Sequence, residues 1–362
     1  MAKIVYGVSG EGSGHSSRAS EIIPFLLDSG HEVKVVSYDR GYNNLKDSFD
    51  VFETEGLHIA SVDNKVSMVK TFTDNLVRLP EGHRSLQLLK VKLFKEFVPD
   101  CVITDFEPMT AYLATHYDLP LITIDNQHRI RYMYYDCPSY LTKDRFITET
   151  IIRSMIPKPD VSLVTTFYFG ETKNDRTFLF PPILRREVLD LIPGDREHIL
   201  VYLTSGFESF VDKLAGLRRE KFMLYGYDKN QEEGNIIYKP FSKEGFLDDL
   251  RTCKAVIATA GFTLLTESIY LKKPYLALPM RGQFEQELNG LMLEEAGFGM
   301  NLRDIREEAI SAFLYRLPDY REKLLKLKNW DNSKIKNKLK ELLENNCALA
   351  VSYHLKRTAV EN

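Results

Sequence analysis

Short apolar runs rich in β-branched residues alternate along the chain with longer segments in which apolar residues recur at helical spacing. In the first half, Lys3–Val8, His31–Tyr38, Cys101–Thr104 and Leu121–Ile124 each have the length and composition of a buried strand. The segment Ser16–Ser29 between the first two places its apolar residues on one helical face. This alternation predicts an α/β fold with parallel strands covered by helices.

The same pattern starts again in the second half. We expect strands at His198–Leu203, Phe222–Tyr225, Ile236–Tyr238, Ala255–Ala258 and Tyr275–Leu278, with helices at Thr263–Leu271 and Gln286–Glu295. The Pro-Pro pair and the Pro-Gly turn within Pro181–Asp195 indicate the join between two units. We therefore expect one domain over residues 1–190 and another over residues 191–362.

The sequence does not fix which domain the C-terminal region packs on. The basic stretch Lys323–Leu343 is predicted to be one helix with a solvated face. A C-terminal helix packing back on the first domain is a further expectation. Ligand binding is expected beyond the carboxyl ends of the strands, where two facing parallel sheets would form one cleft.

Composition narrows the class of protein. The 362 residues are 44% hydrophobic and 27% charged, which excludes a disordered or fibrous chain, and the net charge of −3 gives no support for nucleic-acid binding. No apolar run approaches the about 18 residues of a membrane span, and the first residues lack a signal-peptide pattern, so we expect a cytoplasmic protein. The four cysteines have no C-x-x-C spacing, so no zinc site or disulfide framework is indicated.

A glycine cluster, SGEGSGH, stands between the first strand and the first helix. Gly12 and Gly14 allow backbone N–H groups to approach an anion at the helix N-terminus. The cluster is a poor dinucleotide fingerprint, because the third glycine position of its two frames holds His15 or Ser17. A histidine here can act as a base near neutral pH, or it can simply hydrogen-bond the loop. Both interpretations of His15 stay open on this pattern alone.

A second cluster of polar residues covers Ala258–Gly297. A strand is followed by a turn at Gly261, Thr263 can cap the next helix, and Glu267 follows in its first turns. A diphosphate could rest on that helix N-terminus, with the two oxygens of Glu267 accepting from two ribose hydroxyls. Taken alone, Glu267 would be an acid that stabilises the helix dipole.

The next helix of this block supplies further polar groups. Pro279 ends the preceding strand, and Glu285 and Gln286 begin the helix with side chains that suit the vicinal hydroxyls of a hexose.

The block resembles the nucleotide-sugar donor motif of GT-B glycosyltransferases, both the peptidoglycan N-acetylglucosaminyltransferase type, with its family 28 C-terminal donor motif, and the UDP-glycosyltransferases. The matching residues are Gly261, Glu267, Pro274, Pro279, Glu285, Gln286 and Asn289. The opening GEGSGH is similar to the start of those enzymes, and Val102–Pro120 resembles the segment whose aspartate, here Asp105, partners the catalytic histidine. Thr259 departs from the pattern, since those enzymes carry histidine or arginine there.

The resemblance implies a GT-B fold, with two Rossmann-like parallel-sheet domains facing across a cleft, the first for the acceptor and the second for the donor. It implies an inverting hexosyltransferase that moves a hexose or N-acetylhexosamine from a nucleotide sugar, expected to be UDP-linked, to an acceptor hydroxyl, with a lipid-linked or cell-envelope glycan as one acceptor class. His15 would be the general base and Asp105 its orienting partner. Donor-binding residues would be Gly12, Gly14, Thr259, Gly261, Thr263, Glu267, Glu285 and Gln286.

Neither a resident cofactor nor a metal is expected, because cation-dependent glycosyltransferases hold their metal through closely spaced aspartates and no D-x-D occurs in the chain. The nucleotide sugar itself is the co-substrate. Two alternatives remain: a UDP-sugar 2-epimerase, for which Asp105, Glu107 and Asp125 could supply acids, and a non-catalytic nucleotide-sugar-binding protein in which His15 is structural.

The acceptor side is less defined. Asp125, His128 and Arg131 lie in an aromatic-rich segment, Asp125–Tyr140, that suits a sugar or phosphorylated acceptor, although an aromatic core loop has the same composition. The basic amphipathic stretch Lys65–Lys95 suits peripheral contact with an anionic membrane, although a solvent-facing helix pair over the core is the favoured interpretation.

Overall fold

The computed structural model describes residues 1–56, 61–62, 65–66, 79–204, 206–303 and 306–361. The chain forms two compact units. The first comprises Met1–Ser61, Val66–Arg185 and Asp331–Asn362, and the second Val62–Lys65 and Arg186–Trp330. The division expected after residue 190 therefore lies at Arg185 and Arg186, and the last residues of the chain belong to the first unit.

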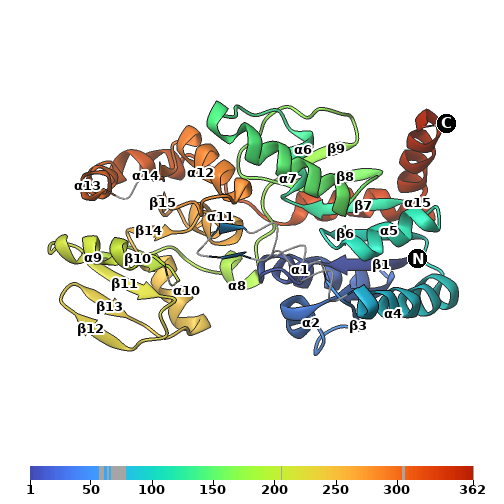
Figure 1. Cartoon of the computed structure of the whole chain (residues 1–362), viewed down its shortest axis with the longest axis horizontal. Coiled ribbons are helices and arrows are strands. Elements are labelled where there is room, and N and C mark those ends of the chain that lie inside the picture. The colour runs from blue at the N-terminus through green and yellow to red at the C-terminus, as the bar shows by residue number, and fades with distance from the viewer. Residues whose placement is uncertain (57–60, 63–64, 67–78, 205, 304–305, 362) are drawn as a thin grey trace. The chain divides into compact units, whose positions relative to one another are not determined.

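Among the described residues, the first unit holds one seven-stranded sheet in the order β3-β2-β1-β6-β7-β8-β9 (Figure 1). Its neighbouring strands are parallel throughout. The strands are β1 (Lys3–Val8), β2 (Glu32–Ser37), β3 (Val51–Glu53), β6 (Cys101–Asp105), β7 (Leu121–Asp125), β8 (Val161–Thr165) and β9 (Thr177–Phe180). The strands predicted here agree within one residue at each end. A separate two-stranded sheet pairs β4 (Ser61–Val62) with β5 (Lys65–Val66).

Helices cover the first sheet. They are α1 (Gly14–Asp28), α2 (Asp39–Leu45), α4 (Leu79–Leu89), its π-helical continuation η1 (Lys90–Phe97), α5 (Pro108–His116), α6 (His128–Tyr132), the 3-10 turn η2 (Ser139–Leu141), α7 (Thr142–Met155) and α15 (Ser333–Glu361). The buried face of α1, which includes Ile22 and Leu26, packs with Ile4 and Val8 of β1 in the main core. Part of the stretch expected to contact a membrane, residues 67–78, lies outside the described residues.

The single helix predicted over Lys323–Leu343 is wrong. The helix α14 ends at Leu325, and α15 begins at Ser333. The face of α15 that carries Leu339 and Leu342 is buried in the core of the first unit, where the helix packs on β7 and β8. The apolar residues of α15 recur at helical spacing among the lysines and form one buried face. The prediction of a solvated helix relied on the basic composition and overlooked this spacing.

Helical geometry stops inside α15 at Glu344–Cys347. Asn345, Asn346 and Cys347 all have left-handed φ angles, of 52°, 55° and 62°. The turn buries Cys347 with its Sγ 3.4 Å from Sγ of Cys101, and both thiols are free.

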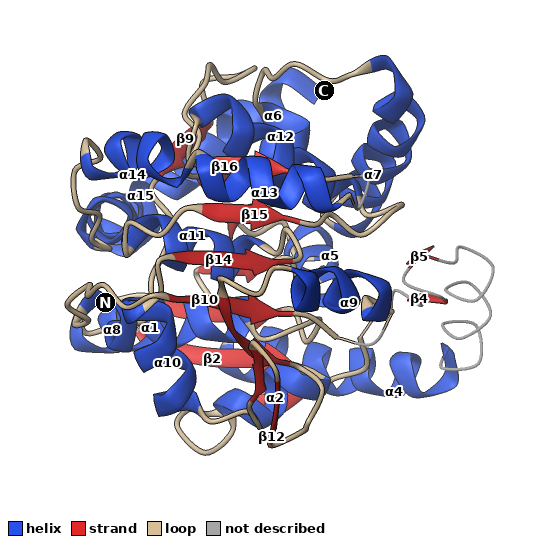
Figure 2. Cartoon of the chain, turned by 90° about the vertical axis from the view of Figure 1, so that its left-hand side faces the viewer, coloured by secondary structure: helices blue, strands red, loops and turns tan. Residues whose placement is uncertain are grey.

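The second unit holds, within the described residues, another seven-stranded sheet in the order β12-β13-β11-β10-β14-β15-β16 (Figure 2). All its pairs are parallel except β12 with β13. The strands are β10 (His198–Tyr202), β11 (Lys221–Tyr225), β12 (Gln231–Glu233), β13 (Ile236–Tyr238), β14 (Ala255–Ala258), β15 (Tyr275–Ala277) and β16 (Gly299–Asn301). The helices are α8 (Arg186–Leu189), α9 (Glu208–Gly216), α10 (Lys243–Thr252), α11 (Phe262–Tyr270), α12 (Phe284–Ala296), α13 (Glu307–Tyr315) and α14 (Leu317–Leu325).

The hydrophobic core of the second unit forms around the central strands. Ile199, Val201 and Ile257 are fully buried there. No helix in the described part of the chain is both long and apolar enough to cross a membrane.

Candidate functional site

In the first unit, two strand ends place a histidine beside an aspartate. Val8 of β1 is in register with Asp105 of β6, and the backbone N–H of Ser9 donates to the carbonyl of Asp105 at 3.0 Å. The chain then turns through the glycine cluster into α1, whose first turn carries His15. Nδ1 of His15 lies 2.6 Å from Oδ1 of Asp105, with the histidine 8% exposed and the aspartate fully buried.

Arg18 completes this group, one turn further along α1. Its Nε donates to Oδ2 of Asp105 at 2.9 Å, and one terminal nitrogen donates to Oδ1 at 2.7 Å. The other terminal nitrogen donates to Oδ1 of Asn126 at 3.1 Å. Arg18 was not among the site residues predicted from the sequence. Its signal was the spacing, since residues three apart share a helix face and Arg18 follows His15 by three residues on the buried face of α1.

Asp105 is an ionised carboxylate at neutral pH. Burial alone would raise its pKa, but the charges of Arg18 and His15 and their hydrogen bonds outweigh burial and hold the pKa below its ordinary value. A contact of 2.6 Å between Nδ1 and a carboxylate oxygen requires a proton between them, and the imidazole supplies it. Nε2 of His15 is then the nitrogen with a free lone pair, which can accept a proton from a substrate.

The glycine cluster shapes the turn before His15. Gly12 has a φ of 77°, which favours glycine, and a Cβ there would meet no atom within 4 Å. A Cβ at Gly10 would lie 2.2 Å from the carbonyl oxygen of Tyr38, so this glycine permits the close approach of the loop to the next strand's end. Gly14 is the first residue of α1.

Glu107, one of the acids considered for an epimerase, serves the fold. It caps α5, accepting from the backbone N–H groups of Met109 at 2.9 Å and Thr110 at 2.7 Å and from the Thr110 hydroxyl at 2.6 Å. Burial raises its pKa, and those hydrogen bonds act in the opposite direction. A Cβ at Gly7 would lie 2.1 Å from the Thr110 hydroxyl oxygen, so β1 needs glycine there.

The three residues expected to bind the acceptor have partners inside the first unit. Asp125 accepts from the backbone N–H of His128 at 2.8 Å, and its other oxygen lies 2.7 Å from Nδ1 of that histidine, with both side chains fully buried. Arg131 donates to the carbonyl of Ile156 at 3.2 Å and stacks over the ring of Tyr132, 4.7 Å from its centroid. Their roles toward an acceptor remain predictions.

In the second unit, β14 ends at Ala258 and α11 begins at Phe262. The N-cap of α11 is Gly261, which has an extended backbone, so the expectation that Thr263 caps the helix is wrong. Thr263 lies inside the first turn, because the chain enters the helix two residues earlier than its polar side chain suggested. The space around Gly261 is open, and the carbonyl of Thr259 accepts from the Tyr275 hydroxyl at 2.6 Å.

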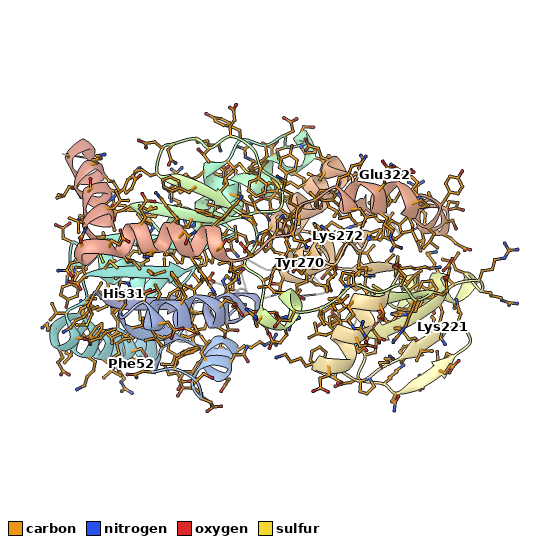
Figure 3. The ribbon with its side chains drawn as sticks, turned by 180° about the vertical axis from the view of Figure 1, so that it is seen from behind. His31, Phe52, Lys221, Tyr270, Lys272 and Glu322 are labelled. Atoms are coloured by element: carbon orange, nitrogen blue, oxygen red, sulfur yellow. The ribbon has the colours of Figure 1, made fainter. Side chains whose placement is uncertain are left out.

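Glu267 lies in the second turn of α11 and is 2% exposed. The far end of the same helix is fixed by two residues labelled in Figure 3. The hydroxyl of Tyr270 donates to the carbonyl of Leu189 at 3.2 Å, and Nζ of Lys272 donates to the carbonyl of Leu327 at 2.9 Å. These two bonds anchor the C-terminal end of the helix that carries Glu267 within the second unit.

The start of α12 is organised by its own side chains. Gln286 accepts from the backbone N–H of Met280 at 3.1 Å and donates to Oε1 of Gln283 at 2.6 Å. Asn289 is fully buried and donates to the carbonyl of Ala260 at 2.7 Å, which links α12 to the turn before α11. Glu285 and Gln286 are both half-buried. The structure thus brings the donor-block residues of α11 and α12 together in one unit.

Two parallel α/β units of this kind are the architecture of GT-B glycosyltransferases. The solved structure of CalG4, the calicheamicin glycosyltransferase, matches with a TM-score of 0.68 at 14% identity, covering 95% of this chain and 99% of that one. Arabidopsis thaliana UGT89C1, solved with UDP, matches with a TM-score of 0.63 at 12% identity, covering 100% of this chain and 99% of that one. These similarities confirm the predicted fold.

The family follows from the sequence comparison. The family model for glycosyl transferase family 1 matches residues 2–318, and the chain belongs to this family. An uncharacterized glycosyltransferase of Methanosarcina acetivorans is 27% identical over 337 residues, which are 83% of this chain and 85% of the relative. The protein is a glycosyltransferase of GT-B type, as the sequence analysis predicted.

Proposed function

We propose that this glycosyltransferase moves a hexose or N-acetylhexosamine from a nucleotide sugar to an acceptor hydroxyl with inversion at the anomeric carbon, and that His15 is the general base. The observation that carries the proposal is the 2.6 Å contact between Nδ1 of His15 and the ionised Asp105. It leaves Nε2 as the proton acceptor, as in other enzymes where an aspartate fixes the tautomer of a catalytic histidine.

The proposed reaction is a single displacement. The acceptor hydroxyl gives its proton to Nε2 of His15 while its oxygen forms a bond to the anomeric carbon, and the bond from that carbon to the nucleoside diphosphate breaks. The protonated imidazole is stabilised by Asp105 and afterwards loses its proton to solvent. General-base catalysis of this kind contributes about 10²–10⁴-fold to a rate.

The donor part of the proposal depends on the second unit. The N-terminus of α11 offers backbone N–H groups for the diphosphate, and Glu267 in its second turn is the proposed partner of the ribose hydroxyls. A UDP-linked donor is favoured by the donor motif and by the UDP bound to UGT89C1. No metal has a part in this proposal, because the helix dipole can stabilise the leaving diphosphate.

The acceptor is proposed to be a hydroxyl compound such as a lipid-linked or cell-envelope glycan. Support comes from the aromatic and basic side chains of Asp125–Tyr140, where the Arg131 guanidinium already stacks on an aromatic ring. The same kind of surface stacks on sugar rings and binds phosphate.

The test compares the native protein, His15→Gln and, as a matched control, His116→Gln, which replaces an exposed histidine at the end of α5. Each is incubated with UDP-sugars, with and without a panel of hydroxyl acceptors. We expect acceptor-dependent glycoside formation that falls about 10²–10⁴-fold in His15→Gln and is unchanged in His116→Gln. A new UDP-sugar formed without acceptor would indicate an epimerase, and binding without any reaction would indicate a sensor. Either result would overturn the proposal.

A further inference from the structure

The buried guanidinium of Arg18 binds both carboxylate oxygens of the buried Asp105. It contacts both carboxylate oxygens and the amide oxygen of Asn126, and it is 5% exposed. A bidentate pair of this kind fixes the plane of the carboxylate, and hence the direction in which Oδ1 faces Nδ1 of His15. The position of the imidazole therefore depends on Arg18 although Arg18 is not its hydrogen-bond acceptor.

The charges of the three side chains give Arg18 a second effect. When His15 is neutral, the buried group carries one positive and one negative charge. When His15 binds a proton, the group carries an excess positive charge, and one terminal nitrogen of Arg18 lies 2.9 Å from Nδ1. Without Arg18, the same proton would neutralise a buried carboxylate and would be strongly favoured. From neighbouring strands, Tyr6 and Asp125 also interact electrostatically with Arg18.

We propose that Arg18 is a positioning residue for the transfer reaction: it aims Asp105 at Nδ1 of His15 and offsets the carboxylate's charge, so that Nε2 of His15 is kept as the atom that accepts the acceptor's proton. The proposal rests on the proposed function, since it concerns the same histidine. It adds to that function a residue that belongs neither to the donor motif nor to the pair of His15 and Asp105.

The first unit contains a second group with the same composition, which serves as an internal control. On α15, His354 and Arg357 are also three residues apart, and both contact Asp160. Nδ1 of His354 lies 3.1 Å from Oδ2 of that aspartate, and Nε of Arg357 donates to Oδ1 at 2.5 Å. Here, however, Nε2 of His354 lies 3.1 Å from Asp118.

The two groups differ in the nitrogen that matters for catalysis. Among the described residues, the polar contacts of His15 within hydrogen-bond distance all fall on Nδ1, whereas His354 uses both ring nitrogens. Asp160 also accepts from the backbone N–H of Leu121 at 2.8 Å. The His354 group thus ties α15 to the sheet and has no free base. Removing Arg357 measures what the loss of a half-buried, aspartate-bound arginine does to the fold alone.

The experiment uses the full chain with Arg18→Gln, Arg18→Lys, Arg18→Met and, as control, Arg357→Met. Gln keeps a hydrogen-bond donor without the charge, and Lys keeps the charge without the bidentate geometry of the guanidinium. We expect the acid limb of kcat/KM against pH to move by about one unit toward higher pH, a tenfold change in proton concentration, in Arg18→Gln and Arg18→Met. In Arg18→Lys the limb should stay in place while kcat falls several-fold. Arg357→Met should lower stability and leave the limb unchanged.

A second readout does not need turnover. The ¹⁵N NMR signals of the His15 ring in the free protein should show an imidazolium at higher pH in Arg18→Gln than in the native protein. An acid limb and ring signals that are unchanged in Arg18→Gln would overturn the inference about Arg18 while leaving His15 as base. Full turnover in His15→Gln would instead overturn the proposed function, so the two failures are distinguishable.

Discussion

Leu184 and Asn332 hydrogen-bond to each other in both directions. The backbone N–H of Leu184 donates to Oδ1 of Asn332 at 3.0 Å, and Nδ2 of Asn332 donates back to the carbonyl of Leu184 at 2.8 Å. Residues 148 apart in sequence are joined in this way at the border of the first unit, next to Arg185, where the chain leaves it, and Asp331, where the chain returns. The side-chain amide of Asn332 thus pairs with the backbone of Leu184 as a neighbouring strand would, and it joins the two chain segments at which the first unit is interrupted.

Asn332→Ala is expected to lower the free energy of unfolding by about 1–3 kcal/mol, because it leaves the buried N–H and C=O of Leu184 without partners. Chemical denaturation monitored by circular dichroism measures the loss. Asn43→Ala, at an exposed position of α2, is the control and should change the stability by less than about 0.5 kcal/mol. Equal stabilities of the two variants would contradict this role.

Asp105→Asn is expected to cost about 3–5 kcal/mol at pH 7, because it leaves Arg18 buried without its counter-charge. The pKa of Asp105 is lowered in the folded protein, so its stabilising effect is fully present above the ordinary value of 3.8 and is lost as the pH falls through the lower folded-state pKa. The stability difference between native protein and variant should therefore persist from pH 7 down to about pH 5 and narrow only in stronger acid. Urea denaturation at a series of pH values tests this, and a difference that vanishes by pH 5 would refute it.

Glu267→Gln is expected to weaken the binding of UDP by about 1.5–3 kcal/mol, the range for hydrogen bonds to a charged group, because the carboxylate loses its charge and one acceptor oxygen. Isothermal titration calorimetry with UDP measures the effect. Glu294→Gln, on the exposed side of α12, is the control and should bind UDP normally. Normal affinity in a folded Glu267→Gln would show that this acid does not contact the ribose.

Gln286→Ala is expected to reduce affinity for UDP-sugars more than affinity for UDP, because its side chain is predicted from the sequence to contact the hydroxyls of the hexose. Its hydrogen bonds to Met280 and Gln283 also hold the loop before α12, so some loss for both ligands is expected. Calorimetry with both ligands separates the two effects. Equal losses would indicate that Gln286 shapes the loop alone.

Transfer is expected to continue in EDTA, since the proposed stabilisation of the leaving diphosphate comes from the N-terminus of α11. Rates are measured with and without the chelator, and then with magnesium or manganese restored. Complete loss on chelation and recovery with the added ion would refute the metal-independent mechanism.

The local sequence was sufficient to predict a strand where its pattern of apolar residues is typical of one kind of element. The apolar runs at Lys3–Val8 and Ala255–Ala258 are strands at those residues, because a parallel strand buried on both faces reads as a continuous apolar segment. The charged strand Gln231–Glu233 escaped prediction, since its pairing with β13 at the sheet edge leaves all its residues exposed. Long-range pairing, rather than composition, makes it a strand.

In the candidate site too, some residues could be predicted from the local sequence and others depend on contacts that only the fold makes. His15 and Asp105 were identified from their places at strand ends and from a family resemblance. Arg18 was missed because its function depends on Asp105, 87 residues away, and only the fold brings the two together. Glu107 and Asp125 appeared as free acids in the sequence, whereas the structure uses one as a helix cap and pairs the other with His128.

The return of α15 to the first unit sets an order of events during synthesis. Every residue of Arg186–Trp330 has been made before Ser333 emerges from the ribosome, so the second unit can complete its core first. The first sheet must wait with part of its core uncovered, because α15 packs on β7 and β8 and contributes Leu339 and Leu342 to the core of that unit. Nascent chains expose such surfaces to aggregation and to chaperones. The earliest-made half of this enzyme is therefore the last to mature.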